Sequence, residues 1–260
     1  DDEPRACNLA SGVTTKNLFG AYWSGRHILY TPDSADWFNM SLISTLGKDE
    51  ADKRKKANQR SYPEILFDAL KIIPGKPSLH LGIEDREFAE RFEQSYLEHN
   101  SIKIGLNTGA GNRWQFKQLD VSKTVDLANE LTRPVGRQIL IFGGPEEVER
   151  NQEIIRKVSC PIVNTGTNNS IRQFAALVGL CDILVTSDSL ALHIASALGV
   201  ATVSFFGPTS VAEIKLFSRG EKIVSPLSCV CCYKRSCDFS PNCMDGISTD
   251  QISLAVQNCL

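Results

Sequence analysis

The stretch from Val185 to Gly199, V-T-S-D-S-L-A-L-H-I-A-S-A-L-G, places an Asp between two Ser, and then a His, where an apolar run gives way to small residues. Ser189 or Asp188 can cap a helix that starts at Leu190, and His193 then lies about one turn along it. The first amides of a helix have unpaired N–H groups and a partial positive charge that attract phosphate. The alternative is a capped helix that carries an incidental histidine.

Three further turns of the same kind follow apolar runs. They read T-G-A-G at 108–111, G-G-P-E at 143–146 and T-G-T-N-N-S at 165–170. Any one of them is more often an ordinary turn than a ligand site. In an open parallel sheet, however, the turns after the strands lie along one edge, and ligands bind there. Four such turns on one edge favour binding of a nucleotide.

Two cations follow the first glycine-rich turn, in G-A-G-N-R-W-Q-F-K. Arg113 and Lys117 could place positive charge beside a diphosphate, while Trp114 packs. Cations so placed stabilise the charge that develops on a departing diphosphate. The alternative is ordinary surface charge.

The elements that must position these groups alternate regularly from Ser101 onward. This alternation predicts a parallel sheet with crossover helices in a doubly wound domain, with all strand-to-helix turns on one edge. The expected strands are 102–107, 137–142, 161–166, 182–187 and 201–208, and the expected helices are 121–131, 146–158, 170–178, 190–198 and 248–260.

The first hundred residues are less regular, with a strand-like segment at 27–30 and helical patterns at 61–73 and 83–97. The segment I-P-G-K-P-S-L at 73–79 is the best candidate for a linker. We therefore expect three parts: a partial N-terminal acceptor-side domain at 1–78, a donor-binding Rossmann-like domain with a Cys-rich loop at 79–247, and a C-terminal helix at 248–260.

Composition narrows the class of protein. With 42% hydrophobic and 22% charged residues, the chain is typical of globular proteins. A net charge of -2 gives no general attraction to nucleic acid, so no nucleic-acid partner is expected. The basic run K-R-K-K-A-N-Q-R at 53–60 is most simply a solvated helix face. There is no apolar run of membrane-spanning length and no signal-peptide pattern, which predicts a cytoplasmic location.

Five of the nine cysteines crowd into one segment, where they form C-x2-C-x4-C-x5-C with Cys231 inside the first pair. The first spacing suits a zinc or iron–sulfur ligand pair, but the whole pattern matches no familiar metal signature. We expect buried or paired thiols and no metal, with a structural metal as the alternative. The four residues of the pattern are Cys229, Cys232, Cys237 and Cys243.

Four stretches in this order resemble glycosyltransferase family 9, the heptosyltransferases of lipopolysaccharide core synthesis. They are I-G-L-N-T-G-A-G-N-R-W-Q-F-K, I-L-I-F-G-G-P-E-E, V-T-S-D-S-L-A-L-H-I-A-S-A-L-G and S-F-F-G-P-T-S. The resemblance covers about 100–260, and R-A-C-N-L-A-S with A-D-W-F-N-M resembles the later part of the family's N-terminal domain. It implies an α/β fold of the GT-B type, with two Rossmann-like domains of which the N-terminal one is incomplete.

The resemblance also implies an activity and its partners: inverting, metal-independent transfer of heptose from ADP-heptose, with no cofactor beyond this donor. The acceptor would be a lipid-linked anionic glycan at the inner membrane surface, towards which the run at 53–60 could steer it. Three alternatives stay open: an inactive donor-binding fragment, a sugar-nucleotide epimerase of the same fold with an acid/base carboxylate pair, and a Cys-rich metal-binding scaffold.

By position, the resemblance implies that Lys117 meets phosphate or sugar, Glu146 or Glu147 the ribose, Asp188 the sugar hydroxyls and His193 the diphosphate. Leu190 stands where that family usually has glycine, so the approach of a donor to the backbone differs there. The complete candidate donor site comprises Thr108, Gly109, Arg113, Lys117, Gly144, Glu146, Glu147, Asp188, Ser189, Leu190, Ala191 and His193.

No catalytic residue is assigned. The family's proposed base is an Asp in a glycine-containing turn early in the N-terminal domain, and nothing before Cys7 matches it. Direct displacement at the anomeric carbon needs a base for the acceptor hydroxyl. From this we expect that the chain begins after that turn and that residues 1–260 alone transfer sugar weakly or not at all.

Overall fold

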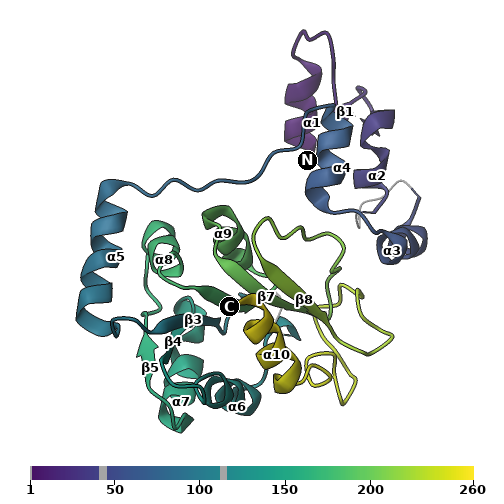
Figure 1. The fold of residues 1–260 in the computed structure, drawn as a ribbon. Helices are drawn as coiled ribbons and strands as arrows, with labels where there is room; N and C mark the ends of the chain where they lie inside the picture. The colour runs from purple at the N-terminus through teal and green to yellow at the C-terminus, as the bar shows by residue number, and fades with distance from the viewer. Residues whose placement is uncertain (1, 41–45, 112–115) are drawn as a thin grey trace. The chain divides into compact units, whose positions relative to one another are not determined.

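The computed structural model describes residues 2–40, 46–111 and 116–260, and its chain packs into two compact units (Figure 1). The first unit comprises 1–75 together with 212–215, and the second comprises 76–211 and 216–260. The C-terminal helix thus belongs to the second unit, whereas a four-residue segment after the fifth strand of that unit's sheet belongs to the first.

A six-stranded parallel sheet forms the centre of the second unit, in the order β5-β4-β3-β6-β7-β8. Numbered within the unit, this is the order 3-2-1-4-5-6 of doubly wound nucleotide-binding folds, which confirms the predicted fold class. The sixth strand, β8, was not predicted, because G-E-K-I-V lies at the sheet edge and is nowhere fully buried. The strands are β3 Ile102–Asn107, β4 Arg137–Phe142, β5 Ile162–Asn164, β6 Ile183–Ser187, β7 Ala201–Phe206 and β8 Gly220–Val224.

Three helices of this unit, α6, α8 and α10, begin after residues that cap them with their side chains. Asp120 accepts from the Lys123 amide, and Ser248 and Gln251 form a reciprocal capping box at the C-terminal helix. Such caps satisfy amides that have no partner inside the helix. The helices are α5 Ile83–Tyr96, α6 Val121–Leu131, the 3-10 turn η3 Pro145–Glu147, α7 Val148–Lys157, α8 Ile171–Val178, α9 Leu190–Leu198 and α10 Thr249–Cys259.

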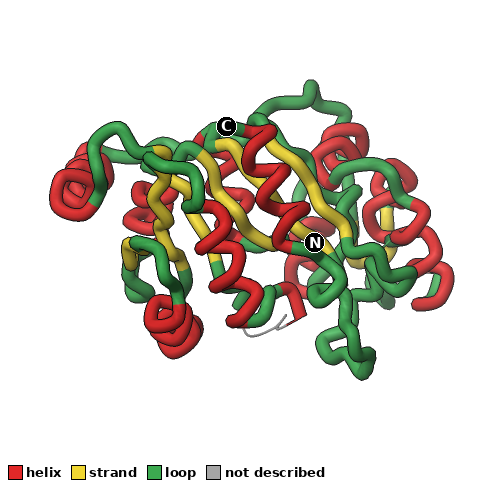
Figure 2. Tube along the Cα trace, turned by 60° about the horizontal axis from the view of Figure 1, so that its bottom comes forward, coloured by secondary structure: helices red, strands yellow, loops and turns green. Residues whose placement is uncertain are grey.

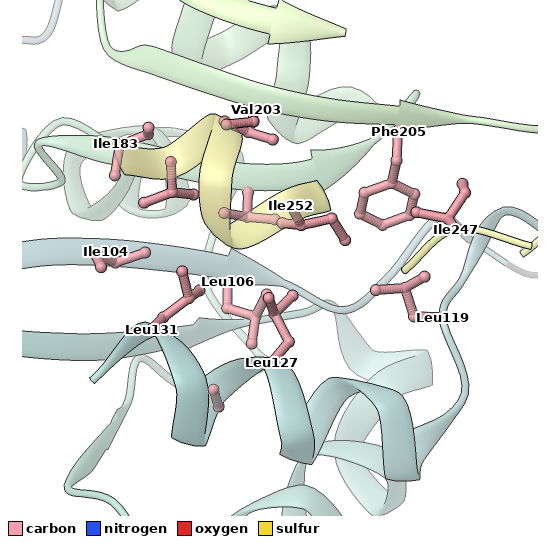
Figure 3. Close-up of a cluster of buried hydrophobic side chains, with 14 of the residues drawn as sticks. Ile104, Leu106, Leu119, Leu127, Leu131, Ile183, Val203, Phe205, Ile247 and Ile252 are labelled. Atoms are coloured by element: carbon pink, nitrogen blue, oxygen red, sulfur yellow. The ribbon is translucent and has the colours of Figure 1, made fainter. Parts of the chain in front are cut away.

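Helices cover both faces of the sheet, as Figure 2 shows. On one face α6 and α10 bury an apolar cluster that includes Ile104, Leu127, Val203 and Ile252 (Figure 3). On the other face α8 and α9 pack against Leu140, Phe142 and Leu184. Alternate residues of each strand thus face opposite layers, and the buried strands read as continuous apolar runs because both faces are covered.

The first unit is built from helices and a small hairpin. β1 (Ala21–Trp23) and β2 (Ile28–Tyr30) pair antiparallel, because the four residues between them are too few for a crossover helix. The described part of this unit therefore contains no parallel sheet, in contrast to the Rossmann-like arrangement expected for it. Its other elements are α1 Pro4–Ser11, η1 Pro32–Ser34, α2 Ala35–Phe38, α3 Lys48–Ala57 and α4 Tyr62–Leu70.

The basic run at 53–60 lies on α3 and the turn after it. Several of its cations pair with nearby carboxylates: Arg54 with Glu50 at 3.1 Å, and Arg60 with Asp36 at 3.0 Å. Such pairs are typical of a solvated helix face. Among the described helices, none is both long enough and apolar enough to cross a membrane.

Residues 212–215 pack against the start of α4 within the first unit. The Tyr62 amide donates to the Glu213 carbonyl at 2.9 Å, and Lys215 Nζ lies 2.7 Å from Glu64 Oε1. The hydrogen bond from Lys215, followed by those from the Ser61 amide and hydroxyl, lowers the pKa of Glu64 to about 2.

This depressed pKa predicts an acid-dependent loss of stability in the first unit. A carboxyl with a lowered folded-state pKa contributes stability above its unfolded value near 4.5, and the contribution is lost as pH falls towards 2. Wild-type protein should lose more thermal stability between pH 5 and pH 2 than Glu64→Gln, measured by scanning calorimetry. Because both side chains are 42% exposed, the difference should be small and should shrink in high salt. Identical pH profiles would contradict the assignment.

Candidate functional site

A cavity of about 420 Å³ opens at the carboxyl edge of the parallel sheet. Turns after four strands, β3, β4, β5 and β6, contribute to its wall. It therefore lies where doubly wound folds bind ligands, beside the point between β3 and β6 at which the strand order reverses. The lining residues are Asn107, Gly109, Ala110, Gly111, Gly143, Gly144, Pro145, Glu146, Glu147, Thr167, Asn169, Ile171, Phe174, Ser189, Leu190 and Ala191.

Asn107, at the end of β3, connects the two turns that flank the strand-order reversal. Its side-chain Nδ2 lies 2.8 Å from the Gly109 carbonyl, 3.0 Å from Thr186 Oγ1 and 3.3 Å from Ser189 Oγ. Because Asn107 is buried, these contacts take the place of the hydrogen bonds that its side chain would make to water. Asn107 thus fixes the turn after β3 against the start of α9, a role that the sequence analysis missed.

The start of α9 differs from the prediction. Ser189 occupies the N-cap position, but neither it nor Asp188 caps the helix with its side chain. The Ser189 hydroxyl instead lies 2.9 Å from Thr186 Oγ1 and also contacts Asn107. The amides at the start of α9 therefore have no side-chain cap within the described chain, and Leu190 and Ala191 line the cavity. Leu190 is exposed there.

The two glutamates after β4 have different surroundings. Glu147 is buried, and its carboxylate accepts from the Gly144 amide at 2.8 Å and from Gln118 Nε2 at 3.4 Å. It also fills the space beside Gly109, where a Cβ atom would lie 2.4 Å from Glu147 Cδ. Glu146 is exposed at the cavity wall. Glu147 therefore holds two turns together, and Glu146 has the carboxylate open to a ligand.

Lys117 and Asp188 form a largely buried ion pair next to the cavity. Lys117 Nζ lies 2.7 Å from Asp188 Oδ2 and 3.0 Å from the Asp188 carbonyl, and the two side chains are 10% and 16% exposed. Neither residue lines the cavity itself, but Asp188 directly precedes Ser189, which does. The pair places a cation and a carboxylate close to the start of α9.

Three predicted site residues lie elsewhere or outside the described chain. The Thr108 hydroxyl contacts Asn151 Oδ1 at 2.5 Å and the Phe142 carbonyl at 3.1 Å, and is buried against α7 rather than lining the cavity. His193 is exposed on α9 and does not line the cavity either. Arg113 falls outside the described residues.

Part of the cavity lining is apolar, and sequence reasoning did not identify the residues of α8 that contribute to it. Ile171 and Phe174 of α8 contribute side chains there, with Pro145 from the turn after β4. Ile171 is 67% exposed although it is large and apolar. The available signal was an aliphatic residue at the first position of α8, directly after a polar turn.

The Cys-rich loop is attached to the turn after β7. The Cys231 amide donates to the Gly207 carbonyl at 2.9 Å, and the Tyr233 amide to the Pro208 carbonyl at 2.8 Å. All nine cysteines are free, and within the described chain no group of three His, Cys, Asp or Glu residues is arranged to hold a metal ion. Burial raises the pKa of the Cys243 thiol to about 11, and the neighbouring thiols of Cys232, Cys237 and Cys229 add to the rise.

Solved structures of similar fold include a glycosyl transferase family 9 protein from Veillonella parvula, with a TM-score of 0.64 and 21% identity over 78% of this chain. Another is Escherichia coli ADP-heptose lps heptosyltransferase II, with a TM-score of 0.57 and 21% identity over 72% of this chain. This chain spans 60% and 54% of the lengths of those two chains. At this identity the likeness concerns the fold alone.

Sequence relatives point to the same family. Lipooligosaccharide heptosyltransferase 2 of Campylobacter jejuni is 27% identical over 223 residues, which cover 82% of this chain and 68% of that protein. Lipopolysaccharide heptosyltransferase 2 of Salmonella typhimurium is 28% identical over 165 residues, which cover 61% and 43%. The family model described as glycosyltransferase family 9 (heptosyltransferase) matches residues 61–242, so the chain belongs to glycosyltransferase family 9.

Proposed function

We propose that this chain binds the donor in an inverting, metal-independent transfer of heptose from ADP-heptose to a lipopolysaccharide core acceptor. The observation that carries the proposal is the convergence of four strand-end turns on one cavity beside the strand-order reversal. Membership of glycosyltransferase family 9 supplies the reaction class. The heptosyltransferase relatives support the sugar and the acceptor.

The cavity lining contains both kinds of group that a nucleotide diphosphate requires. Gly109, Gly111 and the uncapped start of α9 offer backbone amides and close approach for phosphate oxygens. Ile171 and Phe174 offer an apolar surface for a base. Glu146 is exposed along the wall and suits ribose hydroxyls. We therefore place the diphosphate towards α9 and the base towards α8.

Direct displacement would proceed as follows. The acceptor hydroxyl oxygen bonds to the anomeric carbon, the carbon–oxygen bond to the diphosphate breaks, and the hydroxyl proton passes to a base. The α9 amides and Lys117 would stabilise negative charge on the departing diphosphate without a metal ion. Asp188 would orient Lys117 and accept hydrogen bonds from sugar hydroxyls. We assign the donor side of this reaction to the present chain.

The proposed acceptor is a lipid-linked anionic glycan at the inner membrane surface. The relatives named for lipooligosaccharide and lipopolysaccharide heptosyl transfer support this choice. The cations of α3 could assist its approach through long-range attraction. Their pairing with carboxylates of the first unit limits that contribution, and salt should weaken it further.

Nucleotide binding tests the proposal. ADP at one hundred times its dissociation constant should stabilise the protein by about 2.7 kcal/mol, seen as a rise in melting temperature. Addition of a chelator should leave this shift unchanged, because the phosphate-binding groups are amides and Lys117. Inorganic phosphate at the same concentration is the control and should give a smaller shift. No shift with any nucleotide would refute the donor-site assignment and favour the Cys-rich scaffold.

A further inference from the structure

Asn169 is a lining residue whose side chain is held in one orientation. It lies in the turn between β5 and α8, and its Nδ2 donates to the Thr165 carbonyl at 2.9 Å and to the Gly166 carbonyl at 3.2 Å. Carbonyl oxygens only accept hydrogen bonds, so the amide nitrogen must face them. Turning the amide over would place Oδ1 against two carbonyl oxygens and lose both bonds.

The side-chain atom of Asn169 that these hydrogen bonds do not use is therefore Oδ1, which is an acceptor. Its two N–H groups are used within the turn, and no donor in the described part of the chain reaches Oδ1. The turn itself is fixed. The Gly166 amide donates to Asn164 Oδ1 at 2.9 Å, and the Thr165 hydroxyl donates to the Ile141 carbonyl at 2.8 Å. Gly166 has a φ of +84°, a conformation in which other residues are strained.

This acceptor is carried by a residue that lines the cavity together with the apolar residues proposed to hold the base. Asn169 lies in sequence just before Ile171, and both line the cavity together with Phe174. A base that lies on this apolar surface would present its polar edge to the turn after β5. The edge group that pairs with a fixed acceptor is a donor, and adenine and cytosine carry an exocyclic amino group there. Hypoxanthine and uracil carry a carbonyl oxygen instead, which would face Oδ1 unpaired.

We propose that Asn169 Oδ1 selects a donor nucleotide whose base carries an exocyclic amino group over one that carries a carbonyl at the same position. This inference rests on the proposed function, because it requires a nucleotide in the cavity. It assigns base selection to one side chain whose orientation is set by its own turn.

Two pairs of nucleotides test the inference, since each pair exchanges an amino group for a carbonyl on one ring system. Dissociation constants of ADP, IDP, CDP and UDP are measured by titration calorimetry with the full chain. Wild-type protein should prefer ADP over IDP, and CDP over UDP, by about tenfold, the equivalent of about 1.4 kcal/mol. In Asn169→Ala both preferences should fall to within about twofold, while the affinity for IDP stays unchanged and shows that the cavity is intact. Asn168→Ala, an exposed neighbour, should keep both preferences.

Results that contradict the role of Asn169 differ from results that contradict the proposed donor site. Equal affinities within both pairs in wild-type protein, or undiminished preferences in Asn169→Ala, would overturn the role of Asn169 and leave the donor site standing. Loss of IDP binding in Asn169→Ala would also overturn it, because the side chain would then hold the cavity together rather than select the base. If wild-type protein binds none of the four nucleotides, the proposed function fails as well.

Discussion

Lys117→Met should lower the free energy of unfolding of the second unit by about 3 kcal/mol. Its ammonium lies 2.7 Å from the Asp188 carboxylate, and both side chains are largely buried. Removing one partner leaves the other charge desolvated without compensation. The same change removes a cation from beside the proposed diphosphate position, so ADP affinity should fall at least tenfold. Calorimetric unfolding and ADP titration measure the two effects.

Two further variants separate stability from binding. Lys157→Met removes an exposed ion pair with Glu153, whose side chains are 55% and 42% exposed, and should cost less than about 1 kcal/mol. The double variant Lys117→Met with Asp188→Asn should recover much of the lost stability, because no isolated buried charge remains. It should not recover ADP affinity. Equal losses in Lys117→Met and Lys157→Met would contradict the buried pair.

Gly109→Ala should disrupt the cavity through a residue of its lining. An added Cβ would lie 2.4 Å from Glu147 Cδ and 2.6 Å from its Oε1. Glu147 would have to move, which breaks its bond to the Gly144 amide and displaces the turns after β3 and β4 together. Overpacking of this kind costs about 1–3 kcal/mol, and ADP affinity should fall at least tenfold. Thermal unfolding and ADP titration test both expectations.

The matched control is Gly75→Ala, where an added Cβ meets no atom within 4 Å, so stability and ADP affinity should be nearly unchanged. Glu147→Ala provides the second check, because it removes the obstructing side chain. Adding Gly109→Ala in that background should cause little further loss. A full additional loss would show that Glu147 is not the group that requires glycine at this position.

Local patterns predicted most of the second unit. Apolar runs ending in glycine or polar turns gave five of its strands close to their observed bounds, and the helix expected at 248–260 is observed as α10 with nearly the same bounds. Two strands, β3 and β4, match residue for residue. These features depend on residues close together in the chain. The edge strand β8 escaped prediction because its stability comes from pairing with β7 rather than from its own apolar content.

The candidate site was less predictable, because long-range contacts decide what each side chain does. Ser189 or Asp188 was expected to cap α9, but neither side chain does so, and the Ser189 hydroxyl instead contacts Thr186 and the distant Asn107. The hydroxyl of Thr108, a predicted donor contact, bonds to Asn151 on α7, a partner that the sequence does not indicate. The pairing of Lys117 with Asp188 joins residues 71 positions apart. Residue types and turn positions predicted which edge of the sheet carries the site, but they did not predict these side-chain hydrogen bonds and this ion pair.

The first unit includes residues 212–215, so it cannot be excised or exchanged between relatives as residues 1–75 alone. A gene fragment that stops at Gly75 would omit the acceptor of the Tyr62 amide and the cation beside Glu64. The excised piece would therefore lack two contacts at the start of α4 and should be less stable than the same residues in the whole chain. A chimaera that exchanges residues 1–75 with those of a relative should therefore also exchange residues 212–215, even though these are encoded more than a hundred codons downstream.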